Sequence, residues 1–281
     1  MDTLQTLENI STETLLDVFN LSFSDYIVPF CLTKEQLEDK IKSDGIDLSL
    51  SVGAFENDAL IAFILHGYDV IDQVKYAYNA GTGVIPSKRG AKLTTKLYES
   101  ILPLFRKKGI GHVLLEVITT NEPAVKTYQN IGFKIIRKLN CFKGLIVATD
   151  INRPFEIREL EAYDWPKLSS FWDLKPSWQN SITALEKLQQ TTVAIGVYED
   201  EKLLGYAVYN PSLKRIHQLS VDKNYRRRGI GRQLLYEISS RYGEAVSAIN
   251  VDQNSEETVA FLKAMGMEIY VQQYEMELLV N

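Results

Sequence analysis

The sequence predicts an α/β or α+β fold of two tandem domains, each built around a mixed sheet with helices packed against it. Three observations lead to this prediction. The chain has 281 residues, whereas a single domain commonly has about 100 to 200. Strand-like and helix-like segments alternate along it. The same succession of strand-like and helix-like segments also occurs twice, as expected after a duplication. We therefore expect domains at residues 1–150 and 151–281.

The clearest repeated segment is a β-hairpin. Apolar residues alternate over residues 52–65 and again over 193–209, and a polar turn interrupts each run. The two hairpins align without a gap, and Leu60 falls on Leu203 at a constant offset of 143 residues. Later matches have offsets of 137 and 134 residues, which is the pattern left by duplication and small loop deletions.

The second copy contains the fuller set of expected elements. Ile230, Leu234 and Ile238 recur at helical spacing on one face, and Gly266 ends the following helix. We expect a strand at 155–160, one or two helices within 163–188, the hairpin, a strand at 216–221, a helix at 230–242, a strand at 245–251, a helix at 256–264 and strands within 267–279.

The first copy repeats the later part of this plan. It has a predicted helix at 93–107 and a predicted strand at 112–118. Asn121 caps a second helix over 122–131, and Gly132 ends it. The two copies join near residues 145–154, which read as the end of a strand followed by a turn.

Composition excludes several classes of protein. The chain has 31 Lys and Arg against 36 Asp and Glu, so it lacks the basic excess typical of nucleic-acid binding. Its two cysteines, Cys31 and Cys141, lie outside any metal-ligand spacing, so we expect no metal and a reducing compartment. The amino terminus lacks a signal-peptide pattern, and no apolar run is long enough to span a membrane. We therefore expect a soluble cytoplasmic protein.

The most specific motif is the turn Arg-Arg-Arg-Gly-Ile-Gly at residues 226–231, between a predicted strand and a predicted helix. Such a turn directs unpaired backbone N–H groups at one point and leaves room for an anion. It is not a Walker loop, because Gly231 is followed by Arg232 rather than by Lys-Ser or Lys-Thr. The sequence predicts an anion site here, and a solvated basic turn with an ordinary glycine cap is the alternative.

This turn resembles the coenzyme A pyrophosphate turn, Q/R-x-x-G-x-G/A, of the GNAT superfamily of acyl-coenzyme A dependent N-acyltransferases. The resemblance covers both copies. It implies a mostly antiparallel twisted sheet in each domain and acetyl-CoA as cofactor, with its pantetheine arm paired along the strand before the turn. The implied cofactor-binding residues are Leu219, Val221, Arg226, Arg227, Arg228, Gly229, Ile230, Gly231 and Arg232.

A second GNAT motif, Asn-x-x-Ala-x-x-x-Tyr-x-x-x-Gly-Phe, is complete in the first copy. Its members are Asn121, Ala124, Tyr128, Gly132 and Phe133. In the family this tyrosine stands beside the thioester sulfur and can protonate the leaving thiolate, which makes Tyr128 a candidate catalytic acid. A plain core-facing helix residue is the alternative.

The two copies differ in what they retain. The first copy has Lys92 and Thr94 where the family has small residues, and Lys92 must adopt a backbone geometry that glycine tolerates better. The second copy has the intact turn, but Leu262 replaces the tyrosine and Ser255 and Thr258 replace Asn and Ala. We therefore expect the second copy to hold the cofactor, and the first to bind it weakly or not at all.

An amine acceptor needs a base, since an amine with a pKa near 10.4 is almost wholly protonated at pH 7. His217 lies four residues before Val221, where the arylalkylamine acetyltransferase branch of the family has a relay histidine. It is our candidate base, with an expected pKa near 6.5, and backbone N–H groups of its strand would stabilise the oxyanion. A strand histidine that faces solvent or is bonded within the sheet is the alternative.

The resemblance places the acceptor between the first helices and the sheet, where aromatic side chains can line a pocket. An ordinary packed helix face is the alternative. The candidates are Asp25, Tyr26 and Phe30 in the first copy and Trp165, Trp172 and Trp178 in the second.

The resemblance implies an N-acetyltransferase that moves an acetyl group from acetyl-CoA to an amine of a small molecule or peptide. Leu262 favours a different class, a non-catalytic acyl-CoA binding or sensing protein. A scaffold with two degenerate copies is the third possibility. We expect neither nucleic acid nor a membrane as a partner, and the sequence leaves the oligomeric state open.

Overall fold

A computed structural model describes residues 3–27, 31–147 and 155–280. The chain divides into two compact units: unit 1 is Met1–Ile136 with Tyr274–Asn281, and unit 2 is Arg137–Gln273. The fold is α/β with mostly antiparallel strand pairing and flanking helices, as predicted. The expected boundary at residues 150 and 151 lies outside the described residues, so those domain ranges stay a prediction.

Unit 1 has a sheet in the order β1-β2-β3-β4-β5-β12-β6. The helix predicted at 122–131 is found with those bounds, and the helix predicted at 93–107 is one residue longer. Its elements are β1 (Thr3–Thr6), α1 (Thr12–Ser22), α2 (Lys34–Ser43), β2 (Val52–Glu56), β3 (Ala59–Ile71), β4 (Val74–Val84), η1 (Pro86–Lys88), α3 (Leu93–Lys108), β5 (His112–Ile118), α4 (Glu122–Ile131) and parts of β6 (Lys134–Leu145) and β12 (Met267–Leu279).

Unit 2 has a sheet in the order β12-β6-β11-β10-β9-β8-β7. Two short helices and a 3-10 turn occupy the segment predicted to hold one or two helices, and a single strand runs over 267–279. The further elements are β7 (Glu156–Glu159), α5 (Trp165–Ser169), η2 (Trp178–Asn180), α6 (Ile182–Lys187), β8 (Val193–Glu199), β9 (Lys202–Asn210), β10 (Arg215–Val221), η3 (Lys223–Tyr225), α7 (Ile230–Tyr242), β11 (Ala245–Asp252) and α8 (Glu256–Ala264).

The two hairpins repeat each other in backbone detail. In β2 the register to β3 shifts between Ala54 and Phe55, and in β8 the register to β9 shifts between Val197 and Tyr198. These two irregularities are again 143 residues apart, the offset found in the sequence. The duplication inferred from side-chain patterns is therefore present in the strand pairing.

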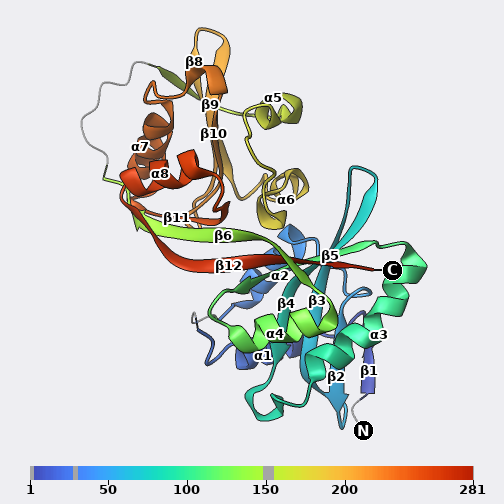
Figure 1. The fold of residues 1–281 in the computed structure, drawn as a ribbon. Coiled ribbons are helices and arrows are strands. Elements are labelled where there is room, and N and C mark those ends of the chain that lie inside the picture. Colours follow the sequence, from blue (N-terminus) through green and yellow to red (C-terminus); the bar gives the residue numbers. More distant parts are fainter. Residues whose placement is uncertain (1–2, 28–30, 148–154, 281) are drawn as a thin grey trace. The chain divides into compact units, whose positions relative to one another are not determined.

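Strands β6 and β12 lie side by side, and each contributes to both units (Figure 1). Strand β6 leaves unit 1 after Ile136 and pairs antiparallel with β11 in unit 2, where Leu139 faces Asp252. Strand β12 enters unit 1 at Tyr274 and buries Met276 in the unit 1 core. Each sheet is thus completed by a strand from the other copy, an exchange that we did not predict.

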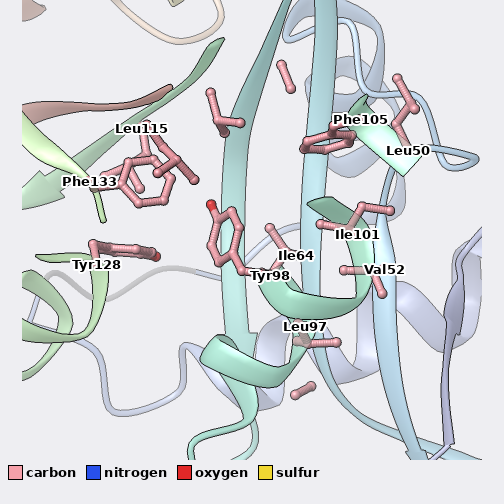
Figure 2. Packing of buried hydrophobic residues seen from close by; sticks show 14 of the residues in the cluster. Leu50, Val52, Ile64, Leu97, Tyr98, Ile101, Phe105, Leu115, Tyr128 and Phe133 are labelled. Carbon is pink, nitrogen blue, oxygen red and sulfur yellow. The ribbon is translucent and has the colours of Figure 1, made fainter. Parts of the chain in front are cut away.

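Helices cover both faces of each sheet. In unit 1, Leu97, Ile101 and Phe105 of α3 pack in one cluster (Figure 2), while α1 and α2 form a second. In unit 2 the predicted apolar face of α7, which includes Ile230 and Leu234, is buried with α8 against the sheet. The short helices α5 and α6 contribute to a separate cluster. The central strands are therefore held from both sides.

Candidate active site

Strands β10 and β11 separate at the centre of the unit 2 sheet. Their parallel pairing ends at Ile216 and Ala248. Both strands are irregular just beyond this point: β10 shifts register around His217, and Asn250 in β11 has a left-handed φ of 57°. A cleft of about 150 Å³ lies along the separated strands, lined also by α8 and by residues 172–176.

The predicted anion turn follows the end of β10. Gly229 has φ 84° and caps the amino end of α7, and a Cβ built on it would meet no atom within 4 Å. The first N–H groups of a helix lack partners within that helix. The turn therefore offers backbone donors, a positive helix end and open space, which together suit an anion.

Arg226 is occupied by protein groups. Its guanidinium lies 2.8 Å from Asp173 and 3.1 Å from Glu257. It also donates to the carbonyl oxygens of Val221 and Phe171, each at 3.2 Å. Arg226 thus ties the turn to neighbouring segments of unit 2, a role that the charge of the motif did not suggest.

The other arginines of the turn are more exposed. Arg227 lies 3.3 Å from Glu257, and Arg228 lies 2.7 Å from Glu199. Arg232 is also exposed. Because the three arginines of residues 226–228 all face carboxylates, the turn carries less net positive charge than its sequence implies.

The remaining predicted cofactor residues have packing roles. Ile230, the first residue of α7, is buried in the unit 2 core. Leu219 and Val221 are partly buried against this core, and Leu219 also lines the cleft. A Cβ on Gly231 would lie 3.1 Å from the ring of Phe261. Glycine at this position therefore lets α7 approach α8 closely.

Unit 1 has the same turn geometry with different residues. Lys92 caps α3 with φ 56°, which confirms that it adopts a left-handed conformation. Gly90 has φ 80°, and Arg89 pairs with Asp25 at 2.7 Å, as Arg226 does with a carboxylate in unit 2. The backbone path is thus kept, but a lysine stands where unit 2 has the open glycine.

His217 is buried at the irregularity of β10, with 7% of its surface exposed. Its Nδ1 lies 3.2 Å from Oδ1 of Asn180, and its Nε2 has no hydrogen-bond partner among the described residues. Burial, with a smaller effect of Arg215, lowers the pKa of His217 to about 3. The expected pKa near 6.5 is therefore too high, and the ring is neutral at pH 7.

In unit 2, Leu262 occupies the position of the tyrosine in the GNAT motif. It lines the cleft and is 3% exposed. Thr258 lies one turn before Leu262 and Ser255 lies two turns before it; their hydroxyls are 2.8 Å apart, and both residues line the cleft. Leu262 has no proton to give, so the acid predicted for the first copy has no counterpart at this position.

The two predicted catalytic residues lie in different units. Tyr128 lies in the unit 1 core, 8% exposed, with its ring 5.6 Å from that of Phe133 and 6.4 Å from that of Tyr98 (Figure 2). Burial raises its pKa above the ordinary tyrosine value. The structure thus places Tyr128 in a core cluster, and its role as an acid stays a prediction.

The three tryptophans expected to line one acceptor pocket lie in different surroundings. Trp172 lines the cleft and donates to the hydroxyl of Tyr206 at 2.6 Å. Trp178 is buried, and Trp165 donates to Glu186 on α6.

The acceptor candidates of unit 1 have other roles. Asp25 is the partner of Arg89, and Tyr26 is partly buried. Phe30 lies outside the described residues.

Sequence reasoning missed the polar residues around His217. Asn180, Gln218 and Tyr206 are joined by hydrogen bonds beside the cleft. They come from η2, β10 and β9, and no motif spacing connects them.

The described residues contain neither a metal-binding cluster nor a membrane-spanning helix. No group of three or more His, Cys, Asp or Glu side chains in this part of the chain could hold a metal ion. Within the same ranges, every helix is too short or too polar to cross a membrane.

Curated relatives match parts of the chain. It is 25% identical over 138 residues to a mycothiol acetyltransferase of Brachybacterium faecium, a match covering 48% of this chain and 40% of that protein. It is 27% identical over 101 residues to N-alpha-acetyltransferase 30 of Schizosaccharomyces pombe, covering 36% and 66% respectively. The chain thus spans less than two thirds of each of these relatives.

Solved structures match the whole chain. A tandem GNAT protein from the clavulanic acid biosynthesis pathway has a TM-score of 0.75 at 12% identity, covering 100% of this chain and 99% of that one. A GCN5-related N-acetyltransferase from Sphaerobacter thermophilus has a TM-score of 0.74 at 15% identity, covering 100% and 96%. These likenesses establish the fold. The model of the acetyltransferase (GNAT) family matches residues 14–133 and 156–267, most of both copies. The chain therefore belongs to the acetyltransferase (GNAT) family, as a member with two GNAT domains.

Proposed function

We propose that unit 2 is an acetyl-CoA dependent N-acetyltransferase that acts on an amine of a small molecule or peptide. The observation that carries this proposal is the position of the cleft. It lies along β10, which holds the buried His217 and ends at the left-handed Gly229 turn. The candidate proton acceptor and the candidate anion site are thus on one strand and the turn that follows it, which supports the proposal.

The residues of unit 2 fit the cofactor. The backbone donors of residues 229–232 would hold the pyrophosphate, and Arg227, Arg228 and Arg232 border that turn. Beyond Ile216, the edge of β10 has no register to β11, so Leu219 and Val221 would pair with the pantetheine arm. When bound, acetyl-CoA supplies the acetyl thioester that an amine attacks.

Residues of this chain would accept the proton of the attacking amine and stabilise the negative charge on the oxyanion. His217 is neutral at pH 7, so the lone pair of the unpartnered Nε2 would be available to accept a proton as the amine nitrogen attacks, while the burial that lowers its pKa also weakens it as a base. Unpaired N–H groups of β10 would stabilise the developing oxyanion. Because Leu262 cannot donate, the departing thiolate would take its proton from water or from another residue. The two relatives named as acetyltransferases support an acyl transfer of this kind.

The first test is turnover. Release of the coenzyme A thiol is measured across a panel of amines with the full chain. Turnover supports the proposal. Cofactor binding without turnover on any amine would instead favour the acyl-CoA binding or sensing protein suggested by Leu262, and absence of binding would favour a scaffold.

We expect one molecule of coenzyme A to bind per chain. Unit 2 offers open space at Gly229, whereas Lys92 and Thr94 occupy the equivalent turn of unit 1. Isothermal titration calorimetry gives the stoichiometry directly. Two sites of similar affinity would contradict the assignment of the cofactor to unit 2 alone.

Replacing His217 with alanine should lower kcat/KM about 10²-fold, because a positioned base is lost. The pH profile should keep its form. The folded pKa of His217 is lowered to about 3, so its ring is already unprotonated throughout pH 6 to 9. The rate should rise about tenfold per pH unit below the pKa of the amine, as free amine increases.

Tyr128→Phe is the control for this measurement. It should leave turnover unchanged if the reaction belongs to unit 2. Loss of turnover in Tyr128→Phe, with His217→Ala fully active, would move the reaction to unit 1. A wild-type inflection near pH 6.5 that disappears in His217→Ala would show that His217 titrates near its ordinary pKa.

A further inference from the structure

The two ring nitrogens of His217 have different surroundings, and Asn180 causes the difference. We propose that Asn180 is a positioning residue that keeps the proton of His217 on Nδ1, so that the buried and unpartnered Nε2 is the ring nitrogen left to accept a proton. The acceptor role rests on the proposed function, whereas the position of the proton can be measured without turnover.

The orientation of the Asn180 amide follows from its other hydrogen bonds. Its Nδ2 donates to the carbonyl oxygen of Ile249 at 2.9 Å and to Oγ of Ser177 at 3.2 Å. A carbonyl oxygen can only accept, so the NH₂ end of the amide must face Ile249. The oxygen end, Oδ1, therefore faces His217 at 3.2 Å.

This orientation fixes the tautomer of the ring. Oδ1 of Asn180 only accepts, so Nδ1 of His217 must carry the hydrogen. A backbone hydrogen bond of Gln179 raises the pKa of His217, but by less than burial lowers it. A neutral imidazole has a single N–H, so Nε2 carries the lone pair, and this is the ring atom left without a partner among the described residues.

Asn180 is itself held in place by a chain of hydrogen bonds. The main-chain carbonyl oxygen of Asn180 accepts from Nε2 of Gln218 at 2.6 Å. Oε1 of Gln218 in turn accepts from the hydroxyl of Tyr206 at 2.7 Å. The hydroxyl of Tyr206 accepts from Nε1 of Trp172 at 2.6 Å. Buried and satisfied polar networks of this kind restrict side-chain motion. This chain holds the backbone of Asn180, and the bonds to Ser177 and Ile249 hold its side-chain amide.

Burial is the main reason that the ring is neutral, and the charged groups around it add to this effect. Arg215, on the same strand, opposes a positive charge on His217. The carboxylates that line the cleft are Asp173, on the segment before η2, and Asp252, on β11. Asp173 pairs with Arg226, and Asp252 lies 3.3 Å from Arg137. Lys175 also lines the cleft and adds positive charge.

The proton can be located by ¹⁵N NMR of the histidine rings in the full chain. The chain has three histidines, so the His217 signals can be assigned with a His217→Gln variant. The wild type should show Nδ1 protonated and Nε2 unprotonated between pH 6 and 8. Asn180→Leu should shift the ring toward the other tautomer. Ser177→Ala is the matched control: it removes one hydrogen bond to Asn180 but none to His217, and should leave the tautomer unchanged.

Kinetics then tests the positioning role. Asn180→Leu should lower kcat about 10-fold or more while the KM for acetyl-CoA stays within about twofold. Asn180→Asp keeps the shape of the side chain but places a carboxylate beside the ring, which raises the pKa of His217. The pH profile of this variant should therefore show an additional acid-side inflection, below which its rate falls more steeply than the wild-type rate.

The outcomes separate the two proposals. A wild-type ring protonated on Nε2, or an unchanged tautomer in a folded Asn180→Leu variant, overturns the positioning role. The positioning role is also overturned if Asn180→Leu changes the tautomer of His217 but leaves kcat unchanged. If the tautomer and its loss are observed but the wild type acetylates no amine, the proposed function fails while Asn180 is still supported as the residue that orients His217.

Discussion

Replacing Gly229 with valine is expected to lower the affinity for coenzyme A by on the order of 100-fold or more, equivalent to about 2.7 kcal/mol. Gly229 has φ 84°, a conformation that a β-branched residue strongly disfavours. Its side chain would also enter the space before the amino end of α7, where a Cβ meets nothing within 4 Å. Calorimetry measures the loss, and a circular dichroism spectrum confirms that the variant is folded.

The matched control is Gly90→Val in unit 1. Gly90 has φ 80° in the equivalent turn, and a Cβ built there also meets no atom within 4 Å. The variant therefore carries a comparable backbone strain, but it should leave coenzyme A binding unchanged. An unaltered affinity in Gly229→Val, or an equal loss in Gly90→Val, would contradict the placement of the pyrophosphate in unit 2.

Replacing Met276 with alanine should destabilise unit 1 by about 2 to 5 kcal/mol, although most of β12 belongs to unit 2. The Met276 side chain is fully buried in the main core cluster of unit 1. Truncation leaves a cavity among well-packed side chains, which is the usual origin of such losses. Hydrogen exchange followed by mass spectrometry should show faster exchange in α3 and β5, with little change in α7.

Met267→Ala is the control on the same strand. Met267 is 1% exposed but packs in the core of unit 2. Its truncation should accelerate exchange in α7 and β11 instead. If both variants loosen the same unit, β12 does not divide between the units at Tyr274 as described.

Local features of the fold were predictable from the sequence. The helix over 122–131 has a cap at Asn121 and a left-handed Gly132 at its end, and both signals act within a few residues. The hairpins were predicted by alternation of apolar residues. The conformation of Lys92 followed from alignment of the two turns, because its backbone must follow the path of Gly229.

Features that depend on distant partners were not predictable. The sequence predicts strands within 267–279 and a strand that ends near residue 145, but it does not say which strand each will pair with. The carboxylates opposite Arg226 come from Asp173 and Glu257, which no motif connects to the turn. The low pKa of His217 arises from its burial, which depends on how η2 covers β10.

Because β6 and β12 are exchanged between the units, the sheet of unit 1 cannot be completed until late in synthesis of the chain. Residues up to Ile136 are synthesised first, but the sheet of unit 1 is complete only after Tyr274 and the residues that follow it. The intervening 137 residues (273 − 136) take roughly 7 to 27 seconds at about 5 to 20 residues per second. Throughout that interval the edge of β5 that β12 later covers stays open, and an open strand edge can pair with another chain. We therefore expect the first half of this protein to be prone to edge pairing with other chains until β12 has been synthesised.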